Sequence, residues 1–434
     1  MKMKESTMIS VILSCGYGRL HLMQSAEWLN NRGMPVWLVC GWVPKRHDGL
    51  FVRLCSFLVG RNLSPGMKKR QVKLDGKSKV VPCTLSDFLF QGLCFIDNHL
   101  FKSVFHEWIR LITWKLLGFH IKNVLMTAKK SSDDSFILHL RSGTGHGGAI
   151  MLARKLGVPV VVDHSIAHPA FMDRQLADEY ARNNRKLDIG IKSPFWRMVA
   201  QDCEWADVVL VNSSFVKRTL VEQGIPPNKI CVIYLGVRSD FLGLRRHVKN
   251  HDTRRPLKLL FTGGFCIRKG AEYILEALKI VMGQAACSVE MDVVGSYEDA
   301  NDLIARNHAF NLPIVFHGPK PQDELKRYLS ASDIYVFPSL AEGCASSGME
   351  AMAAGLCVIA TEESGLPIED GKTGIIVPSK DANAIAEKIL MLMDNRAEID
   401  RLGQNAMELI RDNYSWERYA DNVVNLYNTM IGRK

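Results

Sequence analysis

Short apolar runs alternate with longer stretches of helical spacing, and this alternation limits the fold more than any other feature of the chain. The apolar runs have the length and bounding residues of strands and form two sets. The first set is 9–13, 36–40, 136–140, 159–163 and 208–212, and the second is 257–262, 289–294, 313–317, 334–337 and 357–360. Stretches of helical spacing lie between them: 22–32, 147–156, 270–283, 322–331 and 381–394. The alternation predicts an α/β protein with two parallel, doubly wound sheets.

A polar, charged segment, residues 243–256, separates the two sets of strands and has no apolar periodicity. It predicts a linker between two Rossmann-like domains, residues 1–243 and 256–412, which face each other across a cleft. We expect the end of the chain, residues 413–434, to form a helix that crosses back to the N-terminal domain. Its aromatic residues Trp416, Tyr419 and Tyr427 favour an apolar face.

Composition excludes several classes of protein. Of the 434 residues, 47% are hydrophobic and 23% are charged, as in globular proteins and unlike disordered or fibrous chains. The 11 cysteines form no CxxC pair and no Cys/His cluster, which favours reduced thiols over a disulfide framework or a zinc site. The run Met8–Leu13 predicts a first strand rather than a signal peptide, and no apolar run reaches the roughly 20 residues that span a bilayer. We therefore expect a cytoplasmic protein.

The net charge of +10 is concentrated in the first half of the chain, whereas the second half is mildly acidic. A basic half predicts an anionic partner such as a membrane surface, a phosphorylated lipid or nucleic acid. Residues 98–125 form a basic, aromatic, amphipathic stretch, which is typical of a helix on an anionic membrane and equally of a core helix with solvated lysines. Nearby basic residues favour a peripheral position on the membrane: Lys68, Lys69, Arg70, Lys73, Lys77 and Lys79.

Glu342 and Glu350 flank a loop of small residues between a predicted strand and a predicted helix. The strand 334–337 precedes the loop 343–348, and the helix-forming stretch 349–354 follows it. A strand, a loop of small residues and a helix N-terminus together form an anion site, because free backbone N–H groups and the helix dipole point at it. Two carboxylates beside a phosphate site suit a ligand with hydroxyls on both sides of a diphosphate, such as a nucleotide sugar.

Glycine-rich loops follow two other predicted strands, where parallel sheets bind ligands. After the first strand of the second set, Gly264 allows close approach of a ligand, and Arg268 and Lys269 supply positive charge for a diphosphate. Gly16 and Gly18 follow the first strand of the chain, where a plain tight turn is an equally good interpretation.

Histidines lie at two further predicted strand ends. His164 and His168 follow the strand 159–163, and His146 lies in another glycine-rich turn. A metal site would need a third ligand at a defined spacing, and none is evident in the sequence. A position in the cleft and a structural role both remain open for these side chains.

These segments together resemble the family 4 glycosyltransferases, which are retaining enzymes of GT-B fold. The E-x7-E pattern, with PS before it and EAMAAG after it, is specific in this combination. Further matching segments, in the expected order, are GVPVVVDHS, ADVVLVNSSFVKRTLVEQGI, IRKGAEYILEAL and EDGKTGIIVP. The resemblance covers most of the chain. It implies a hexosyltransferase with a UDP or GDP sugar as donor and a glycan or lipid-linked acceptor, in bacterial cell-surface polysaccharide synthesis.

The resemblance also implies roles for individual residues. Glu342 contacts the hydroxyls of the donor sugar, and Glu350 holds the hydroxyls of the ribose. Arg268 and Lys269 bind the diphosphate and stabilise the leaving group, and His164 lies in the cleft near the reacting sugar. Further donor-binding positions are Gly264, Gly343, Cys344, Ala345, Ser346, Ser347, Gly16 and Gly18.

The chemistry asks for stabilisation of a leaving nucleoside diphosphate, which preorganised cations and helix N–H groups provide. The chain has no DxD pattern, so we expect a metal-independent reaction in which Arg268 and Lys269 act instead, with no cofactor. Phe265 stands where many members of the family have arginine. We favour front-side attack with retention. A double-displacement glycosidase, whose two carboxyl groups stand about 5–5.5 Å apart, is discounted because Glu350 is assigned to the ribose.

Other functions compete with this interpretation. One is a GT-B epimerase or phosphorylase, although a phosphorylase would require a pyridoxal-phosphate lysine in a much longer chain. Another is a non-catalytic sugar-nucleotide-binding subunit, against which the presence of both glutamates, Arg268, Lys269 and His164 argues. Nucleic-acid binding explains the basic half but not the C-terminal motifs, so we expect no nucleic-acid partner.

Overall fold

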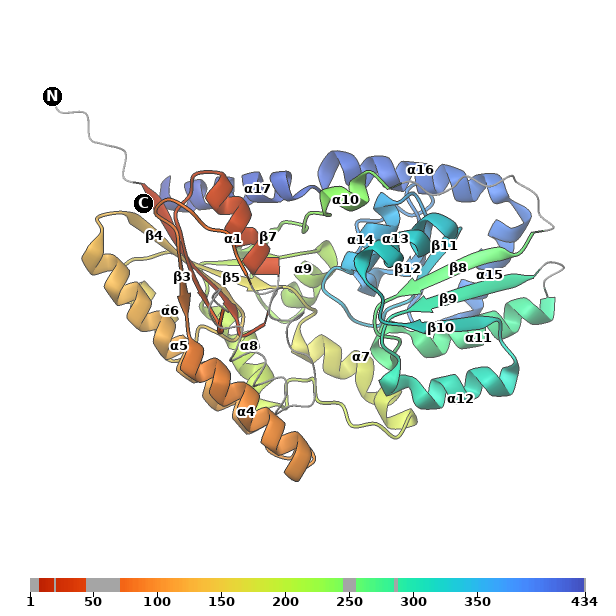
Figure 1. Cartoon of the computed structure of the whole chain (residues 1–434), viewed down its shortest axis with the longest axis horizontal. Coiled ribbons are helices and arrows are strands. Elements are labelled where there is room, and N and C mark those ends of the chain that lie inside the picture. Colours follow the sequence, from red (N-terminus) through yellow and green to blue (C-terminus); the bar gives the residue numbers. More distant parts are fainter. Residues whose placement is uncertain (1–7, 19–20, 44–70, 245–254, 285–287, 433–434) are drawn as a thin grey trace.

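The computed structural model describes residues 8–18, 21–43, 71–244, 255–284 and 288–432. The first domain is built on a sheet of seven parallel strands in the order β3-β2-β1-β4-β5-β6-β7 (Figure 1). The strands are β1 (Ile9–Gly16), β2 (Val36–Cys40), β3 (Lys79–Pro82), β4 (Ser135–Arg141), β5 (Val160–His164), β6 (Val208–Val211) and β7 (Ile230–Val232). The helices are α1 (His21–Asn31), α4 (Thr84–Leu100), α5 (His106–Ser131), α6 (Ala149–Lys155), α7 (Pro169–Arg182), α8 (Pro194–Trp205), α9 (Ser214–Val221) and α10 (Ser239–Leu242).

The second domain has a sheet of six strands in the order β10-β9-β8-β11-β12-β13, in which every pair is parallel. The strands are β8 (Leu257–Thr262), β9 (Val289–Val294), β10 (Ile314–Gly318), β11 (Ile334–Phe337), β12 (Cys357–Thr361) and β13 (Ile375–Val377). The helices are α11 (Ala271–Gln284), α12 (Asn301–Phe310), α13 (Gln322–Ala331), α14 (Ser346–Ala353), α15 (Ala382–Asp394), α16 (Arg396–Asn413) and α17 (Trp416–Gly432).

Both faces of the first sheet are covered, as a doubly wound fold requires. Successive residues of β1 point to opposite faces. Val11 and Leu13 pack in one core with α1 and α17, whereas Ile12 packs in the other core with the buried face of α5. The predicted class of fold, two parallel sheets in an α/β protein, is confirmed.

The last helix, α17, crosses back to the first domain as predicted (Figure 1). Trp416, Tyr419 and Tyr427 are buried in the core that contains β1 and α1. The two passages of the chain between the domains run side by side, because the Val237 N–H donates to the Tyr414 carbonyl at 2.7 Å.

All ten predicted strands are present, but the sequence analysis missed three more. These are β3, β7 and β13, each of three or four residues, and each forms an edge of its sheet. β3 and β13 have only two or three consecutive apolar residues, too few for an apolar run to be recognised, whereas β7 begins an apolar run, residues 230–235, that the sequence analysis did not assign to a strand.

The prediction of one continuous helix over residues 98–125 is wrong. The chain ends α4 at Leu100, turns through Phe101–Phe105 and begins α5 at His106, so the two helices form a hairpin. Asp97 holds the turn, because one carboxylate oxygen accepts from the Phe105 N–H at 2.9 Å and its carbonyl accepts from the Ser103 N–H at 3.1 Å.

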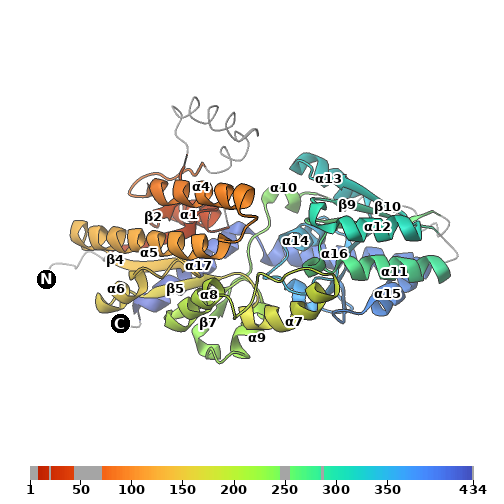
Figure 2. The same cartoon turned by 90° about the horizontal axis from the view of Figure 1, so that it is seen from below.

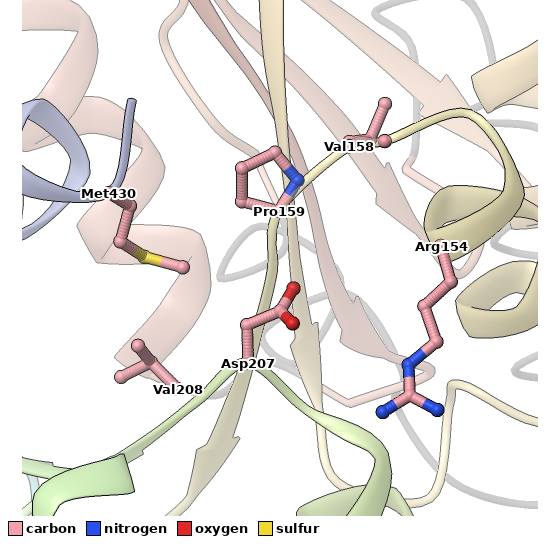
Figure 3. A pocket seen from close by; sticks show the side chains of 7 residues that line it. Arg154, Val158, Pro159, Asp207, Val208 and Met430 are labelled. Atoms are coloured by element: carbon pink, nitrogen blue, oxygen red, sulfur yellow. The ribbon is translucent and has the colours of Figure 1, made fainter. Parts of the chain in front are cut away.

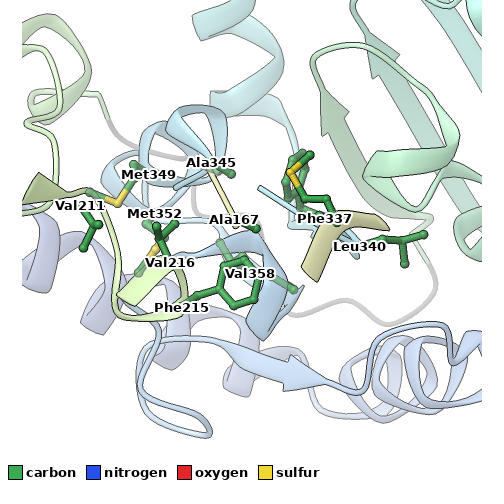
Figure 4. Packing of buried hydrophobic residues seen from close by; sticks show 14 of the residues in the cluster. Ala167, Val211, Phe215, Val216, Phe337, Leu340, Ala345, Met349, Met352 and Val358 are labelled. Carbon is green, nitrogen blue, oxygen red and sulfur yellow. The ribbon is translucent and has the colours of Figure 1, made fainter. Parts of the chain in front are cut away.

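The two domains share an apolar contact. Side chains on the cleft side of both domains belong to one continuous buried cluster. Figure 4 shows this packing, with Ala167, Val211, Phe215 and Val216 of the first domain near Leu340, Ala345, Met349 and Met352 of the second. The two domains are therefore held against each other by the burial of apolar side chains.

Within the described residues, none of the helices combines the length and the apolar character that crossing a bilayer requires. Two features from the sequence lie outside those residues: the basic triplet Lys68–Arg70 and most of the predicted linker, residues 245–254.

Candidate active site

The candidate site lies at the carboxyl ends of the strands of the second domain, where parallel sheets bind ligands. β8 leads through Gly264 into a short 3-10 turn, Ile267–Lys269, and β11 leads through residues 338–345 into α14. The Leu340 N–H donates to the Arg268 carbonyl at 2.8 Å, so the two loops are joined by a backbone hydrogen bond. The fold thereby brings the glycine-rich loop and the glutamate-bearing loop to one place.

Glu342, Arg268 and Lys269 form one charged cluster. Glu342 Oε1 lies 2.8 Å from Arg268 Nη1 and 3.7 Å from Lys269 Nζ. The guanidinium also donates to the Ala341 carbonyl at 2.7 Å, which fixes its direction. Burial lowers the pKa of Arg268, whereas the Glu342 carboxylate, Cys266 and Tyr180 raise it, and their combined effect leaves the pKa above its ordinary value. Two cations around one carboxylate leave an excess positive charge, which suits an anionic ligand.

Phe265, which stands where many members of the family named in the sequence analysis have arginine, does not belong to this charged cluster. Its side chain is buried and packs edge-on against Phe261 and Phe316. Arg268, in the turn that follows, provides the guanidinium instead.

The loop after Glu342 is packed directly against the first domain. The Glu342 carbonyl accepts from the Ala167 N–H at 3.1 Å, and the Gly343 carbonyl accepts from Ser213 Oγ at 2.5 Å. A Cβ at Gly343 would lie 2.0 Å from the Ser165 carbonyl oxygen, so only glycine permits this approach. Gly343 is thus placed as a contact between the domains.

The small residues after Gly343 differ in what they offer a ligand. Ala345 precedes α14 without a side-chain cap, and Ser346, the first residue of the helix, is exposed. Ser347 is directed inward, because it accepts from the Tyr335 hydroxyl at 2.8 Å. Burial raises the pKa of the Cys344 thiol well above its usual range, so it stays protonated. Ser346 is the accessible side chain of this set.

Glu350 lies in a cleft of about 820 Å³ between the domains. Other residues that line it are His21, Gln24, Leu235, Gly236, Val237, Arg238, Asp240, Lys320, Pro321, Gln322, Asp323, Cys344, Ser346, Met349 and Trp416. Burial raises the pKa of Glu350 to about 7; the charge of Arg238 opposes this shift and that of Asp240 adds to it. A carboxyl group that titrates near neutrality in a cleft is a frequent property of functional sites.

The first domain places His164 behind the cleft surface. Its side chain is fully buried, and Nδ1 lies 3.0 Å from Ser142 Oγ. Burial lowers the pKa of His164 to about 3, so the ring is neutral. The ring therefore does not line the cleft in this conformation. The segment that follows it reaches the second domain, since the Ala167 N–H donates to the Glu342 carbonyl.

His21 lines the cleft and was missed by the sequence analysis. Its Nε2 lies 3.0 Å from both carboxylate oxygens of Asp163, and Ser165 Oγ donates to the same carboxylate. Burial tends to raise the pKa of Asp163, but interactions with His21, His139 and Ser165 together outweigh it and lower the pKa to about 2. The sequence carried one signal for this pair, a carboxylate at a strand end and a histidine opening the helix after the first strand.

Arg238 and Lys320 also line the cleft and were not predicted. Arg238 Nη1 donates to Gln322 Oε1 at 2.5 Å, and its Nε donates to Asp240 at 3.0 Å. Neither cation lies in a recognisable motif, and the cleft that they share forms only in the folded chain.

Four other predicted positions are not among the residues that line this cleft. Gly16 adopts φ +77 and a Cβ there would lie 3.6 Å from Trp114, whereas Gly18 has open space around it. His146 contacts a backbone carbonyl of α8 at 3.1 Å, and His168 caps α7, accepting from the Ala170 N–H at 3.1 Å. The structural interpretation therefore holds for His146 and His168.

A second cavity, of about 340 Å³, lies at the amino ends of strands β5 and β6 of the first sheet (Figure 3). Its lining comes from the starts of β5 and β6 and from the ends of α6 and α17: Arg154, Gly157, Val158, Pro159, Asp207, Val208 and Met430. The strand ends that carry the candidate site point away from it. Among the described residues, no group of three or more His, Cys, Asp and Glu side chains is placed to hold a metal ion.

Two family models match the chain. The model described as Glycosyltransferase Family 4 matches residues 95–241, and the model described as Glycosyl transferases group 1 matches residues 256–395. Together they cover most of both domains, including the loops with Glu342, Arg268 and Lys269.

The chain is also similar to named proteins. It is 29% identical over 289 residues to the amylovoran biosynthesis glycosyltransferase AmsK of Erwinia amylovora, covering 64% of this chain and 65% of that one. It is 23% identical over 240 residues to the capsular polysaccharide biosynthesis glycosyltransferase CapM of Staphylococcus aureus, covering 52% of this chain and 62% of that one. The chain thus spans less than two thirds of the length of these relatives.

The fold resembles that of solved glycosyltransferase structures. Anabaena Alr3699/HepE in complex with UDP and glucose superposes with a TM-score of 0.60 at 14% identity, over 97% of this chain and 99% of that one. With two facing parallel-sheet domains, a returning C-terminal helix and both family models matched, the chain belongs to the family 4 glycosyltransferases and has the GT-B fold.

Proposed function

We propose that the protein transfers a hexosyl group from a UDP or GDP sugar to a glycan or lipid-linked acceptor, with retention at the anomeric carbon. The observation that carries this proposal is the cluster of Glu342 with Arg268 and Lys269 at the strand ends of the second domain. It places two cations beside one carboxylate, so that positive charge for a diphosphate and an acceptor for sugar hydroxyls lie together. Glu350, in the helix α14 that follows the Glu342 loop, lines the cleft.

The proposed reaction breaks the bond between the anomeric carbon and the diphosphate while the acceptor oxygen attacks from the same face. The departing diphosphate oxygen takes the proton of the acceptor hydroxyl. Arg268 and Lys269 stabilise the charge that develops on the leaving group, because they are already positioned and little reorganisation is needed. Glu342 positions the sugar, and the proposal includes neither metal nor cofactor.

The relatives support a place in cell-surface polysaccharide synthesis, since the names of the two similar proteins refer to amylovoran and capsular polysaccharide. The HepE complex with UDP and glucose supports a nucleotide-sugar donor.

The proposal is tested by titrating the purified protein with UDP and GDP in a calorimeter. We expect one of the two to bind with a micromolar dissociation constant, and we expect slow hydrolysis of one of its sugars in a screen without acceptor. Failure of both nucleotides to bind would contradict the proposal. Binding without hydrolysis or transfer of any sugar tested would favour a non-catalytic sugar-nucleotide-binding subunit.

Glu350 gives donor binding a predictable dependence on pH. Its pKa is raised to about 7 in the ligand-free cleft. Hydrogen bonds from ribose hydroxyls favour the ionised carboxylate and lower that pKa, so the donor binds more tightly as the proton is lost. Between pH 6 and pH 8 we expect the affinity for the nucleotide sugar to rise about tenfold.

Calorimetry in two buffers of different ionisation heat measures the proton released on binding. Glu350→Gln should bind more weakly and with little dependence on pH. Asp323→Asn is the matched control, because Asp323 lines the same cleft and lies outside the proposed ribose contact. Equal pH slopes for the wild type and Glu350→Gln would rule out this role for Glu350.

A further inference from the structure

The hairpin of α4 and α5, residues 84–131, carries most of the exposed large apolar side chains in the described part of the chain. The most exposed of them are Leu85, Leu100, Val104, Trp108, Ile112 and Phe119, which keep between 51% and 75% of their surface accessible. Figure 2 shows α4 and α5 side by side along one side of the first domain. An exposed apolar surface of this extent marks an interaction site.

This exposure is a property of one face of a well-packed hairpin. On α5, Trp114, Leu117 and Ile121 are buried in the core against the first sheet. Trp108 and Ile112, one helical turn apart, are exposed on the other side of the same helix. The inner face therefore fixes the hairpin on the domain and leaves the outer face without a partner in the described chain.

The charges of the hairpin are one-sided. Its acids are turned inward: Asp87 is buried and accepts from the Trp42 N–H at 2.8 Å, and Asp97 is buried in the turn. The third acid, Glu107, is half-buried with Oε1 3.5 Å from the Phe195 N–H. Within residues 84–131, all of which the structure describes, no acidic side chain is exposed.

Lysines, in contrast, accompany the apolar surface. The exposed ones are Lys102, Lys115, Lys129 and Lys130. Exposed Trp, Phe and Leu side chains with lysines and without acids complement a surface that has negative headgroups above hydrocarbon.

We infer that the α4–α5 hairpin docks on the surface of an anionic lipid bilayer. The apolar side chains of the outer face enter the boundary between headgroups and acyl chains, and the lysines pair with anionic headgroups. The inference goes beyond the proposed function, because binding to the bilayer requires no nucleotide sugar.

The hairpin also supports the glycine loop after β1. The Tyr17 ring stacks on Phe90 of α4 at 5.2 Å and meets Trp114 of α5 edge-on at 6.3 Å. The Tyr17 hydroxyl donates to the Thr113 carbonyl. Docking of the hairpin would therefore bring the loop with Gly16 and Gly18 close to the lipid surface. A lipid-linked acceptor would then lie near this loop, and that consequence rests on the proposed function.

Co-sedimentation of the full chain with vesicles tests the inference. At low salt we expect the protein to sediment with vesicles of equal parts phosphatidylglycerol and phosphatidylcholine and to remain largely in solution with phosphatidylcholine alone. Leu100→Glu combined with Trp108→Glu should lower the bound-to-free ratio at least tenfold. Lys102, Lys115 and Lys129 changed together to Gln should lower it about 100-fold, with most of the loss at low salt.

Matched controls carry the same substitutions on the second domain. Met282→Glu with Val315→Glu replaces exposed apolar residues, and Lys279, Lys372 and Lys388 changed together to Gln replace three lysines, as in the hairpin variant. Both should bind vesicles as the wild type does. A wild type that stays in solution with anionic vesicles, or controls that lose binding as the hairpin variants do, would overturn the inference.

Two further measurements distinguish docking on a bilayer from self-association and from donor binding. Gel filtration without lipid should show the same oligomeric state for the wild type and Leu100→Glu/Trp108→Glu; an oligomer lost only in that variant would assign the surface to a second copy of the chain and overturn the inference. Calorimetry with UDP and GDP should give equal affinities for the wild type and the hairpin variants. Failure of nucleotide binding alone would contradict the proposed function and leave the vesicle result standing.

Discussion

Lys269→Ala is expected to lower kcat/KM for sugar transfer about 10²–10³-fold, the loss typical when one preorganised group is removed from a developing charge. The effect should fall mainly on kcat, because the diphosphate becomes more negative as its bond to the sugar breaks. The fold should be retained. Lys269 Nζ lies 3.7 Å from Glu342, and the carboxylate keeps its closer partner, Arg268 at 2.8 Å, when the lysine is removed.

Steady-state kinetics with the identified donor, together with a thermal melt, check this expectation. Lys372→Ala is the matched control, because this exposed lysine on the same domain pairs only with Glu369 among the described residues. A turnover number for Lys269→Ala within a factor of two of the wild type would remove Lys269 from the catalytic residues.

Substitution of Lys269 tests catalysis more directly than substitution of Glu342 or His164. Glu342→Ala would leave Arg268, which is 2.8 Å away, without its carboxylate, and so it changes the charge of the whole cluster. His164→Ala would open a cavity at a fully buried position and destabilise the first domain. Loss of activity in either variant would therefore mix chemistry with structure.

Gly118→Ala is expected to destabilise the first domain by about 3 kcal/mol or more. Gly118 lies in the middle of α5, and a Cβ there would stand 1.3 Å from the His146 carbonyl oxygen and 3.0 Å from that of Thr144. These atoms belong to the backbone and cannot rotate away. The helix would have to move off the sheet, with loss of its buried contacts.

Gly92→Ala is the matched control, because Gly92 lies in the middle of α4 with open space around its Cα. Alanine is a better helix former than glycine, so the free energy of unfolding of this variant should be about 1 kcal/mol higher than that of the wild type. Urea unfolding followed by tryptophan fluorescence measures both values. If the free energy of unfolding of Gly118→Ala lies within about 1 kcal/mol of the wild-type value, α5 does not lie as close to residues 144–146 as the structure places it.

Most strands of the two sheets could be predicted, because their residues are largely buried and therefore form apolar runs in the sequence. Three strands at sheet edges were missed, whereas the edge strand β10 was predicted. β3 and β13 have only two or three consecutive apolar residues, and the apolar run that begins with β7, residues 230–235, was not assigned to a strand. The hairpin shows a second limit. Its apolar residues, on both faces, read as one amphipathic stretch, and the turn at Phe101–Phe105 contains neither glycine nor proline to mark it.

The candidate site divides in the same way. Glu342, Arg268 and Lys269 could be predicted to meet, because two loops at one edge of a parallel sheet lie close together wherever the intervening chain goes. His21 and Asp163 are 142 residues apart, and their pairing depends on the order of strands in the sheet, which the sequence does not state. Arg238 and Lys320 belong to different domains and share a cleft only after the domains meet.

The side-by-side passages at Val237 and Tyr414 make the first domain depend on chain that follows the second. A protease cut in the linker between β7 and β8 would leave the first fragment with an incomplete core. The second fragment would contain α17, whose Tyr419 and Tyr427 complete the core of the first domain. The fragments should therefore remain associated after cleavage, and the first domain should not fold well when it is expressed only up to the linker.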